Sequence, residues 1–212
     1  MRTYDRRGAW FTVVCVLLLG LFFLRNGTTQ VADGPPQPGS AVAVRHSTAD
    51  PLPPAPAPAP VPHSAPQRIT VPSVKVDAPL IEVGLDADGW VEPPPLENRN
   101  LAGWYRESVS PGERGTSVIV GHVDNKAGPA VFYELGALER GSRIEIPRED
   151  GRRAVFAVYD VEVFAKKKFP AARVYADGPE PELRVITCGG DYTEKTGYDG
   201  NVVVFARLVE LR

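Results

Sequence analysis

The sequence predicts a mostly β domain, an antiparallel barrel or sandwich, preceded by an apolar N-terminal segment and a proline-rich spacer. Short runs rich in Val, Ile and Phe recur through residues 67–212, with turn residues between them. Half of the 22 prolines fall between Pro35 and Pro66, which separates this domain from the apolar segment. No internal repeat and no glycine-rich phosphate-binding motif interrupts the pattern.

The N-terminal segment is typical of an exported protein. Residues 1–8 carry arginines, and residues 9–24 are apolar apart from Thr12. A positive start before such a run marks a secretory signal or a signal anchor. No small-residue cleavage site follows directly, so we expect an uncleaved transmembrane anchor over residues 9–25. Residues 1–8 would then stay in the cytoplasm and the rest would be extracellular. A cleaved signal is the alternative.

Residues 26–66 are expected to form a disordered spacer. The alternating Ala-Pro run from Ala55 to Pro62 favours extended polyproline II and cannot build a core. Such a spacer holds the following domain away from the membrane. His46 and His63 lie in it and are expected to be solvated.

In the first half of the domain, Ile69–Val71 and Leu80–Val83 are predicted to be short strands. Val76–Pro79 between them suggests a bend or an edge. Trp90 and Trp104 are expected in the core or in a groove wall. Thr116–Val120 has the continuous apolar character of a buried strand.

The second half begins with a predicted short helix over Ala130–Leu138. Ile144 and Ile146 then alternate with polar residues, and Asp150-Gly151 predicts a hairpin. The strand that follows, residues 154–164, is expected to place Val155, Ala157, Tyr159, Val161 and Val163 on one face. Lys166–Lys168 is expected to be a solvated loop, with an anionic wall polymer as an alternative contact, and Pro170–Tyr175 a helical turn.

The last two strands are predicted at Leu183–Thr187 and Asn201–Leu208, with a Gly-rich loop between them. Cys188 stands where the first of these strands meets that loop. It is the only cysteine outside the apolar N-terminal run. An exposed position is unusual for a residue that ordinarily prefers burial.

Composition excludes several classes of function. The formal net charge of -2 gives no support for nucleic-acid binding. The lone thiol of the domain excludes a redox dithiol. One Cys and one His would leave half of a zinc shell to carboxylates, so no metal site is expected.

Cys188 and His122 form the candidate catalytic pair. His122 is the only histidine outside the spacer, and it follows the predicted strand Thr116–Val120. A thiolate beside an imidazole suits acyl transfer, in which the sulfur attacks a carbonyl and the imidazole moves the proton. A purely structural cysteine is the alternative. The pairing requires both strand ends to lie at one mouth of a barrel.

At these residues the sequence resembles the sortases, membrane-anchored cysteine transpeptidases of Gram-positive bacteria. Val185-Ile186-Thr187-Cys188 resembles the end of the family's Thr-Leu-x-Thr-Cys motif, and Gly121-His122-Val123-Asp124 the stretch around its catalytic His. Further blocks resemble the class F sortases of actinobacteria: Ala102–Tyr105, Gly128–Tyr133, Cys188–Gly190 and Asn201–Ala206.

The resemblance implies an eight-stranded barrel and a two-step reaction without a cofactor. Cys188 would cleave the Thr-Gly bond of an LPxTG-like C-terminal sorting signal on a secreted protein and form a thioester. His122 would protonate the leaving amine. A cell-wall precursor amine would then accept the acyl group.

One departure from the family concerns an arginine expected near the start of the strand after the Cys. Asn201 stands there instead. Asn201, with Thr187, is our candidate for stabilising the oxyanion or the substrate. Arg207 and Arg184 are the alternatives, or no residue replaces the arginine.

Two other functions stay open at this point. An exported cell-wall L,D-transpeptidase would also be β-rich, but its His and Cys lie close in sequence, unlike His122 and Cys188. The other alternative is an inactive, tethered binding module.

Overall fold

The computed structural model describes residues 16–17, 34–39 and 58–212. Its contacts divide the chain into one unit that ends at Gly34 and another that begins at Pro35. The predicted cytoplasmic segment, nearly all of the predicted anchor and much of the spacer lie outside the described residues. None of the helices in the described ranges is both long enough and apolar enough to span a membrane.

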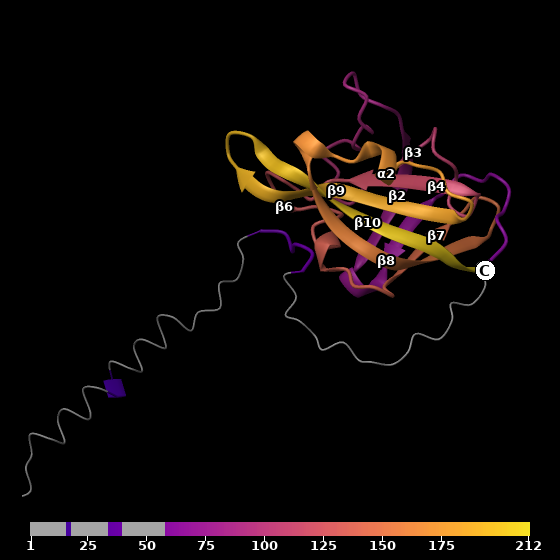
Figure 1. The fold of residues 1–212 in the computed structure, drawn as a ribbon, viewed down its shortest axis with the longest axis horizontal. Coiled ribbons are helices and arrows are strands. Elements are labelled where there is room, and N and C mark those ends of the chain that lie inside the picture. Colours follow the sequence, from indigo (N-terminus) through magenta and orange to yellow (C-terminus); the bar gives the residue numbers. More distant parts are fainter. Residues whose placement is uncertain (1–15, 18–33, 40–57) are drawn as a thin grey trace, which may run out of the picture. The chain divides into compact units, whose positions relative to one another are not determined.

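The second unit is a closed barrel in which the strands follow the order β1-β2-β3-β4-β9-β10-β8-β7 (Figure 1). Most neighbours are antiparallel, whereas β2 with β3 and β4 with β9 are parallel. The predicted eight-stranded, mostly β barrel is confirmed. The strands are β1 Arg68–Val71, β2 Val76–Val83, β3 Ala102–Tyr105, β4 Gly115–Gly121, β7 Arg143–Pro147, β8 Arg153–Ala165, β9 Pro181–Thr193 and β10 Gly197–Leu211.

Helical structure is sparse in the barrel unit. The predicted turn at 170–175 corresponds to α2 Ala171–Val174, and short 3-10 turns occur at η1 Pro72–Val74, η2 Leu135–Ala137 and η3 Lys166–Lys168. The predicted helix over Ala130–Leu138 is wrong: only η2 forms there. The apolar side chains of Phe132 and Leu135 in this segment are fully buried and belong to the barrel core.

Two small strands that were not predicted from the sequence also form. β5 Asp124–Asn125 and β6 Gly128–Pro129 pair as a short hairpin directly after β4. The pairing of β5 with β6 fixes the path of the backbone that follows His122.

β2 runs without a break through the predicted bend at Val76–Pro79. Leu80 donates its amide to Gln67, so the missing N–H of Pro79 points to the other side of the strand. Pairing with β3 begins only at Leu80 on that side, so Pro79 breaks no ladder hydrogen bond.

The buried face of β8 also differs from the prediction. Ala154, Phe156 and Val158 belong to the barrel core, whereas Ala157 and Tyr159 are only half-buried. Opposite β10, a register shift leaves Tyr159 unpaired between Val158 and Asp160. The extra residue changes the phase of the strand, so the next residue packed on the barrel core is Val161.

The barrel wall is buried on both faces where β4, β9 and β10 adjoin. Ile119, Val185 and Val204 point into the barrel core. The neighbouring residues Val118, Val120, Ile186, Val203 and Phe205 form a second apolar cluster outside it. Burial on both faces explains the continuous apolar run at residues 116–120.

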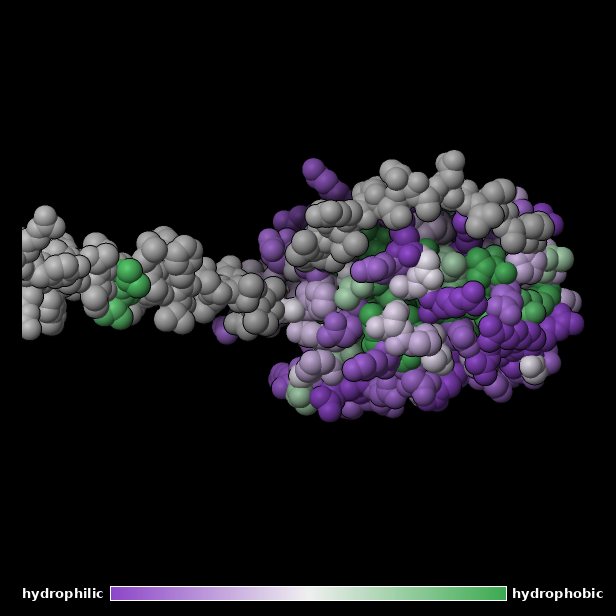
Figure 2. All heavy atoms as spheres, turned by 90° about the horizontal axis from the view of Figure 1, so that it is seen from below, coloured by the Kyte–Doolittle hydropathy of each residue, from purple (hydrophilic) through white to green (hydrophobic). Residues whose placement is uncertain are grey.

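The covering residues of this outer cluster come from β2, the end of β8, α2 and the loops beside them. Val83 and Val174 are buried in it, and Phe164, Phe169 and Tyr175 pack against it. On the face in Figure 2, polar side chains surround several separate apolar areas.

A buried arginine, Arg148, binds the residues that lead into β1. Arg148, 1% exposed, donates to the Pro62 carbonyl oxygen at 2.6 Å and to the Ser110 hydroxyl at 3.3 Å. Asp150 pairs with its guanidinium at 3.0 Å. His63, expected to be a solvated linker residue, stays largely exposed but pairs with Glu113 at 3.1 Å. The last residues of the predicted spacer therefore pack on the barrel.

A second N-terminal segment, Pro35–Gly39, also contacts the barrel unit. Gln37 Oε1 accepts the backbone N–H of Gly190 at 3.1 Å. A Cβ on Gly136 would lie only 1.9 Å from the Pro36 carbonyl oxygen, so only glycine admits this close approach.

Candidate active site

His122 and Cys188 are brought together by the parallel pairing of β4 with β9. Ile119 is opposite Val185, and Val120 is opposite Ile186. The bond from the Thr187 hydroxyl to the Gly121 carbonyl continues this alignment by one residue, so the next residues, His122 and Cys188, line the same cavity. Neighbouring strands lie about 4.8 Å apart, so residues far apart in sequence become neighbours across one strand pair.

Asn201 lies on the other side of Cys188, because antiparallel pairing places it directly opposite in β10. Side chains alternate between the two faces of a strand. Ile186 and Val203 belong to the outer cluster, so Cys188 and Asn201 share that outer face. The site therefore lies on the outside of the barrel wall, not at a mouth of the barrel as the sequence suggested.

Cys188 lies within a strand rather than before a loop. β9 continues to Thr193 and β10 begins at Gly197, with an irregular register between Tyr198 and Gly200. A Cβ on Gly189 would lie 2.5 Å from Val202, and Gly190 has a φ of 83°. The two glycines thus admit the close backbone approach of this hairpin, and the thiol is left half-buried.

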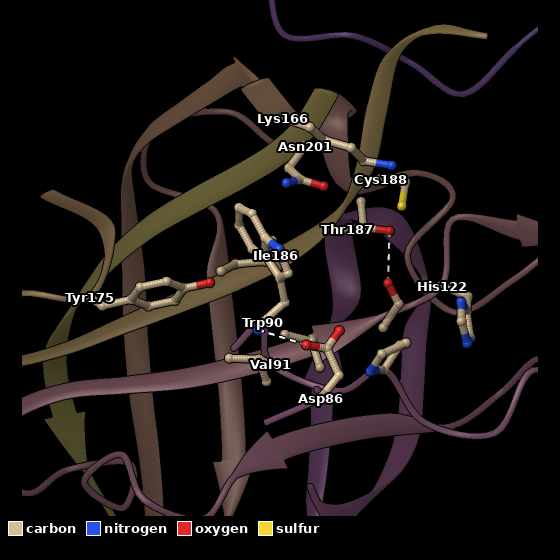
Figure 3. Close-up of a pocket in the computed structure, with 13 residues that line it drawn as sticks. Asp86, Trp90, Val91, His122, Lys166, Tyr175, Ile186, Thr187, Cys188 and Asn201 are labelled. Atoms are coloured by element: carbon tan, nitrogen blue, oxygen red, sulfur yellow. Dashed lines mark hydrogen bonds between the residues drawn. The ribbon is translucent and has the colours of Figure 1, made fainter. Parts of the chain in front are cut away.

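His122, Cys188 and Asn201 line one cavity of about 390 Å³ (Figure 3). Its floor is the outer face of β4, β9 and β10. Its walls come from the loop after β2, from η3 and from the chain after α2. The lining residues are Asp86, Trp90, Val91, Pro93, Val120, Gly121, His122, Lys166, Tyr175, Ile186, Thr187, Cys188 and Asn201.

The His122 ring is held by the loop before β3. Its Nε2 lies 2.7 Å from the Pro94 carbonyl oxygen. A carbonyl only accepts, so Nε2 carries the proton that it donates. In the neutral imidazole Nδ1 is then the nitrogen free to accept a proton.

Thr187 connects the strand of Cys188 to the strand end before His122. Its buried hydroxyl donates to the Gly121 carbonyl oxygen at 2.9 Å. Gly121 itself is hemmed in, because a Cβ there would lie 2.6 Å from the Phe132 ring. Thr187 thus sets the spacing of the two strands, and its hydroxyl proton is donated to Gly121.

The ionisable groups of the cavity stand at different places around it. In Figure 3, the Lys166 side chain extends toward Cys188, and Asp86 lies on the side away from it. The Asp86 carboxylate accepts the backbone N–H groups of Asp88 and Trp90, at 3.0 and 2.9 Å. Burial, with the nearby Tyr105, raises the pKa of the Tyr175 phenol, so this hydroxyl stays a neutral donor.

Of the three candidates for the missing arginine, only Asn201 lines the cavity. Arg184 is buried, pairs with Glu182 and lies 4.7 Å over the Phe205 ring. Arg207 is opposite Glu182, well along β10 from Asn201, and is exposed.

The hairpin beyond Cys188 is joined to the segment after His122. The Tyr198 hydroxyl donates to the Asp124 carboxylate at 2.5 Å. Burial, together with this bond, raises the pKa of the Tyr198 phenol. A protonated donor therefore links both candidate catalytic segments at neutral pH.

The sequence pointed to His122, Cys188, Thr187 and Asn201, and the structure places all of them at this cavity. Trp104 is in the core, whereas Trp90 is exposed and forms cavity wall. Asp86, Lys166 and Tyr175 were missed as site residues, because each reaches the cavity from a connection between strands. Within residues 16–17, 34–39 and 58–212, no cluster of metal-ligating side chains occurs.

Comparison with known proteins identifies the class to which this fold and site belong. The family model of the sortase domain matches residues 69–209. The chain therefore belongs to the sortase family and is a cysteine transpeptidase. No curated protein matches it.

Solved sortase structures share the fold at low identity. Sortase A from Listeria monocytogenes is 16% identical with a TM-score of 0.52, covering 71% of this chain and 90% of its own. Sortase A from Actinomyces oris is 22% identical with a TM-score of 0.53, covering 74% and 87%. A lid mutant of sortase A from Corynebacterium diphtheriae is 20% identical with a TM-score of 0.53, covering 72% and 74%.

Proposed function

We propose that this sortase cleaves the Thr-Gly bond of an LPxTG-like sorting signal through a thioester on Cys188. The single observation that supports this most is that an imidazole, His122, and a half-buried thiol, Cys188, line the same cavity at the ends of the paired strands β4 and β9. Such a pair suits acyl transfer from a peptide to an amine. The resemblance to class F sortases supplies the substrate class.

The proposed reaction begins when His122 takes the thiol proton of Cys188. The sulfur bonds to the threonine carbonyl carbon, and the carbonyl π electrons move to oxygen. When this intermediate collapses, the C–N bond breaks and the leaving amine receives the proton from His122. The Asn201 amide lies across the strand pair from the sulfur and is a suitable donor to the oxyanion.

The second step returns the enzyme to its starting state. An amine of a cell-wall precursor attacks the thioester, His122 removes its proton, and the sulfur leaves as the thiol. The product is a secreted protein joined to the wall through a new amide bond. We place this reaction at the outer surface of a Gram-positive cell, with residues 9–25 as the membrane anchor and 26–66 as the spacer.

The test is to trap the thioester on the full chain. Cys15 is replaced by Ser so that Cys188 is the only thiol, and the protein is mixed with a peptide bearing an LPxTG-like signal. Intact-mass spectrometry should show an acyl adduct that hydroxylamine removes. Cys188→Ala should abolish both the adduct and the cleavage.

Three results would contradict the proposal. Cleavage that survives Cys188→Ala would remove Cys188 from the mechanism. A peptide scan in which only wall-type peptides with D-residues acylate Cys188 would favour an L,D-transpeptidase, and no acylation by any peptide would favour a binding module.

A further inference from the structure

We propose that Lys166 is a catalytic residue that supplies positive charge to the oxyanion formed at Cys188. This inference rests on the proposed function and adds a group to its mechanism. Among the residues that line the cavity, Lys166 is the only lysine or arginine. An acyl transfer develops negative charge on the carbonyl oxygen, and a cation aimed at that place lowers the barrier.

The position of Lys166 follows from the sheet. β8 pairs with β10 so that Phe164 is opposite Asn201 and Ala165 is opposite Gly200. Lys166 is the next residue, where β8 ends and η3 begins. Asn201 in turn is opposite Cys188. Two successive strand pairings thus carry the start of η3 to the edge of the cavity nearest the thiol.

The side chain of Lys166 is directed to the reacting end of the cavity. In Figure 3 it extends from the end of β8 toward Cys188, above the Asn201 amide. Asn201 and Lys166 therefore approach the sulfur from the same side of the cavity, and His122 approaches from β4. The carbonyl oxygen of a peptide bound at Cys188 would then face both the Asn201 amide and the Lys166 ammonium group.

No carboxylate among the described residues pairs with the Lys166 ammonium group. Within the described part of the chain, its ammonium group makes no ion pair and no side-chain hydrogen bond. The acidic residue of the same cavity, Asp86, accepts backbone N–H groups on the side away from Cys188. By contrast, the nearby Arg173 is paired with Glu162. Lys166 is thus an exposed cation at the edge of the cavity, with no acidic partner among the described residues.

Lys166 enters the reaction during the first step. As the sulfur–carbon bond forms, the carbonyl π electrons move to oxygen, and the ammonium group contacts that oxyanion without transferring a proton. When the C–N bond breaks, the electrons return to the carbonyl and the contact ends. The cation therefore binds the intermediate more strongly than the substrate, which raises kcat rather than lowering KM.

The first arm of the test measures charge at the sulfur and needs no substrate. Full-length protein with Cys15→Ser is modified at Cys188 by an anionic and by a cationic methanethiosulfonate of similar size. The ratio of the two rates cancels the intrinsic reactivity of the thiol. A full charge within several ångströms, screened by water, changes this ratio by about tenfold.

Lys166→Met should lower the anionic-to-cationic ratio by about this factor, and Lys166→Arg should restore it. Lys167→Met is the matched control, since Lys167 is the next residue of η3 and does not line the cavity. It should leave the ratio unchanged. An unchanged ratio in Lys166→Met would overturn the proposal.

The second arm measures the rate of thioester formation with a sorting-signal peptide. Lys166→Met should lower kcat by about 10- to 100-fold with KM little changed, since an exposed cation contributes less than a buried donor. Lys166→Arg should recover most of the loss. An effect confined to KM, and only for peptides with an acidic side chain, would assign Lys166 to substrate binding and overturn the catalytic role.

The two arms separate this proposal from the proposed function. If the wild-type protein forms no thioester but the reagent ratio still responds to Lys166, the transpeptidation chemistry fails and the cation at the sulfur stands. If the thioester forms normally in Lys166→Met, the proposed function stands and the role of Lys166 fails.

Discussion

At the scale of single residues, the hydrogen bond from Thr187 to Gly121 fixes the distance between the strands of Cys188 and His122. Thr187 is 4% exposed, and the Gly121 carbonyl accepts its hydroxyl at 2.9 Å. Thr187→Val keeps the shape and removes the donor. Leaving a buried carbonyl unpaired costs about 1–3 kcal/mol.

We therefore expect Thr187→Val to lower the free energy of unfolding by that amount and to slow acylation of Cys188. Urea denaturation and the rate of thioester formation measure the two effects. Thr187→Ser retains the hydroxyl and should stay near wild type on both. Normal acylation in Thr187→Val would show that strand spacing does not depend on this bond.

Asn201 offers a second prediction at this scale, because it is opposite Cys188 and its amide can donate to an oxyanion. Asn201→Ala should lower the acylation rate by about 10- to 100-fold. Asn201→Asp should lower it further, since a carboxylate repels the developing charge. Thermal unfolding serves as the folding control, and unchanged turnover in Asn201→Ala would exclude the oxyanion role.

At the scale of elements, the β9–β10 hairpin is held to the segment after β4 by the bond from Tyr198 to Asp124. Tyr198→Phe removes only the hydroxyl. The hairpin should then open more often, so backbone amides of residues 190–200 should exchange hydrogen faster, as measured by mass spectrometry. Acylation of Cys188 should slow with it.

Tyr192→Phe is the control for this prediction. The Tyr192 ring packs against the Tyr198 ring, tilted by 56° with the centroids 5.0 Å apart, and in the described part of the chain its hydroxyl makes no hydrogen bond. Protection of the hairpin should be unchanged in this variant. If the hairpin amides exchange equally slowly in both variants and in the wild type, packing of the two rings, and not the Tyr198 hydroxyl, holds the hairpin.

Elements whose identity depends on local pattern were predictable from the sequence. The strands around residues 116–120, 144–146 and 201–208 follow from apolar runs, and the β7–β8 hairpin follows from Asp150-Gly151, where Gly151 has a φ of 80°. The strand β3 and the phase of β8 were missed. β3 is only Ala102–Tyr105, and β8 changes phase at a bulge that exists only through its pairing with β10.

The candidate site was predictable only in part, for a related reason. Cys188 and His122 stand out because few side chains can do thiol chemistry, whatever the fold. That they are neighbours depends on the parallel register of β4 and β9, and Lys166 reaches the cavity only through the pairing of β8 with β10. Register is set by packing over the whole barrel and leaves no local trace in the sequence.

At the scale of the whole molecule, the buried Arg148 connects the entering chain to the barrel, and Asp150 compensates its charge. The hydrogen bond with Arg148 holds the pKa of Asp150 below its usual value. A carboxyl whose pKa is lowered by folding stabilises the fold above its unfolded pKa of about 3.9, and that stability is lost as pH falls through the folded pKa.

Asp150→Asn should therefore lower the melting temperature at pH 7, and the difference from wild type should shrink as the pH falls below about 4. Calorimetry across this pH range measures it. Asp88→Asn is the control, because Asp88 is exposed and, among the described residues, its carboxylate makes no hydrogen bond. A difference that stays constant with pH would contradict a role for the Asp150 charge.

The contact of Gln37 with Gly190 has a mechanical consequence. Gly190 is two residues beyond Cys188 in β9, and its N–H is held by the side chain of a residue that precedes the barrel by some thirty positions. The segment Pro35–Gly39 is therefore joined to the strand that bears the thiol. Any displacement of this segment would reach the reaction centre through one N–H···O hydrogen bond to a glycine.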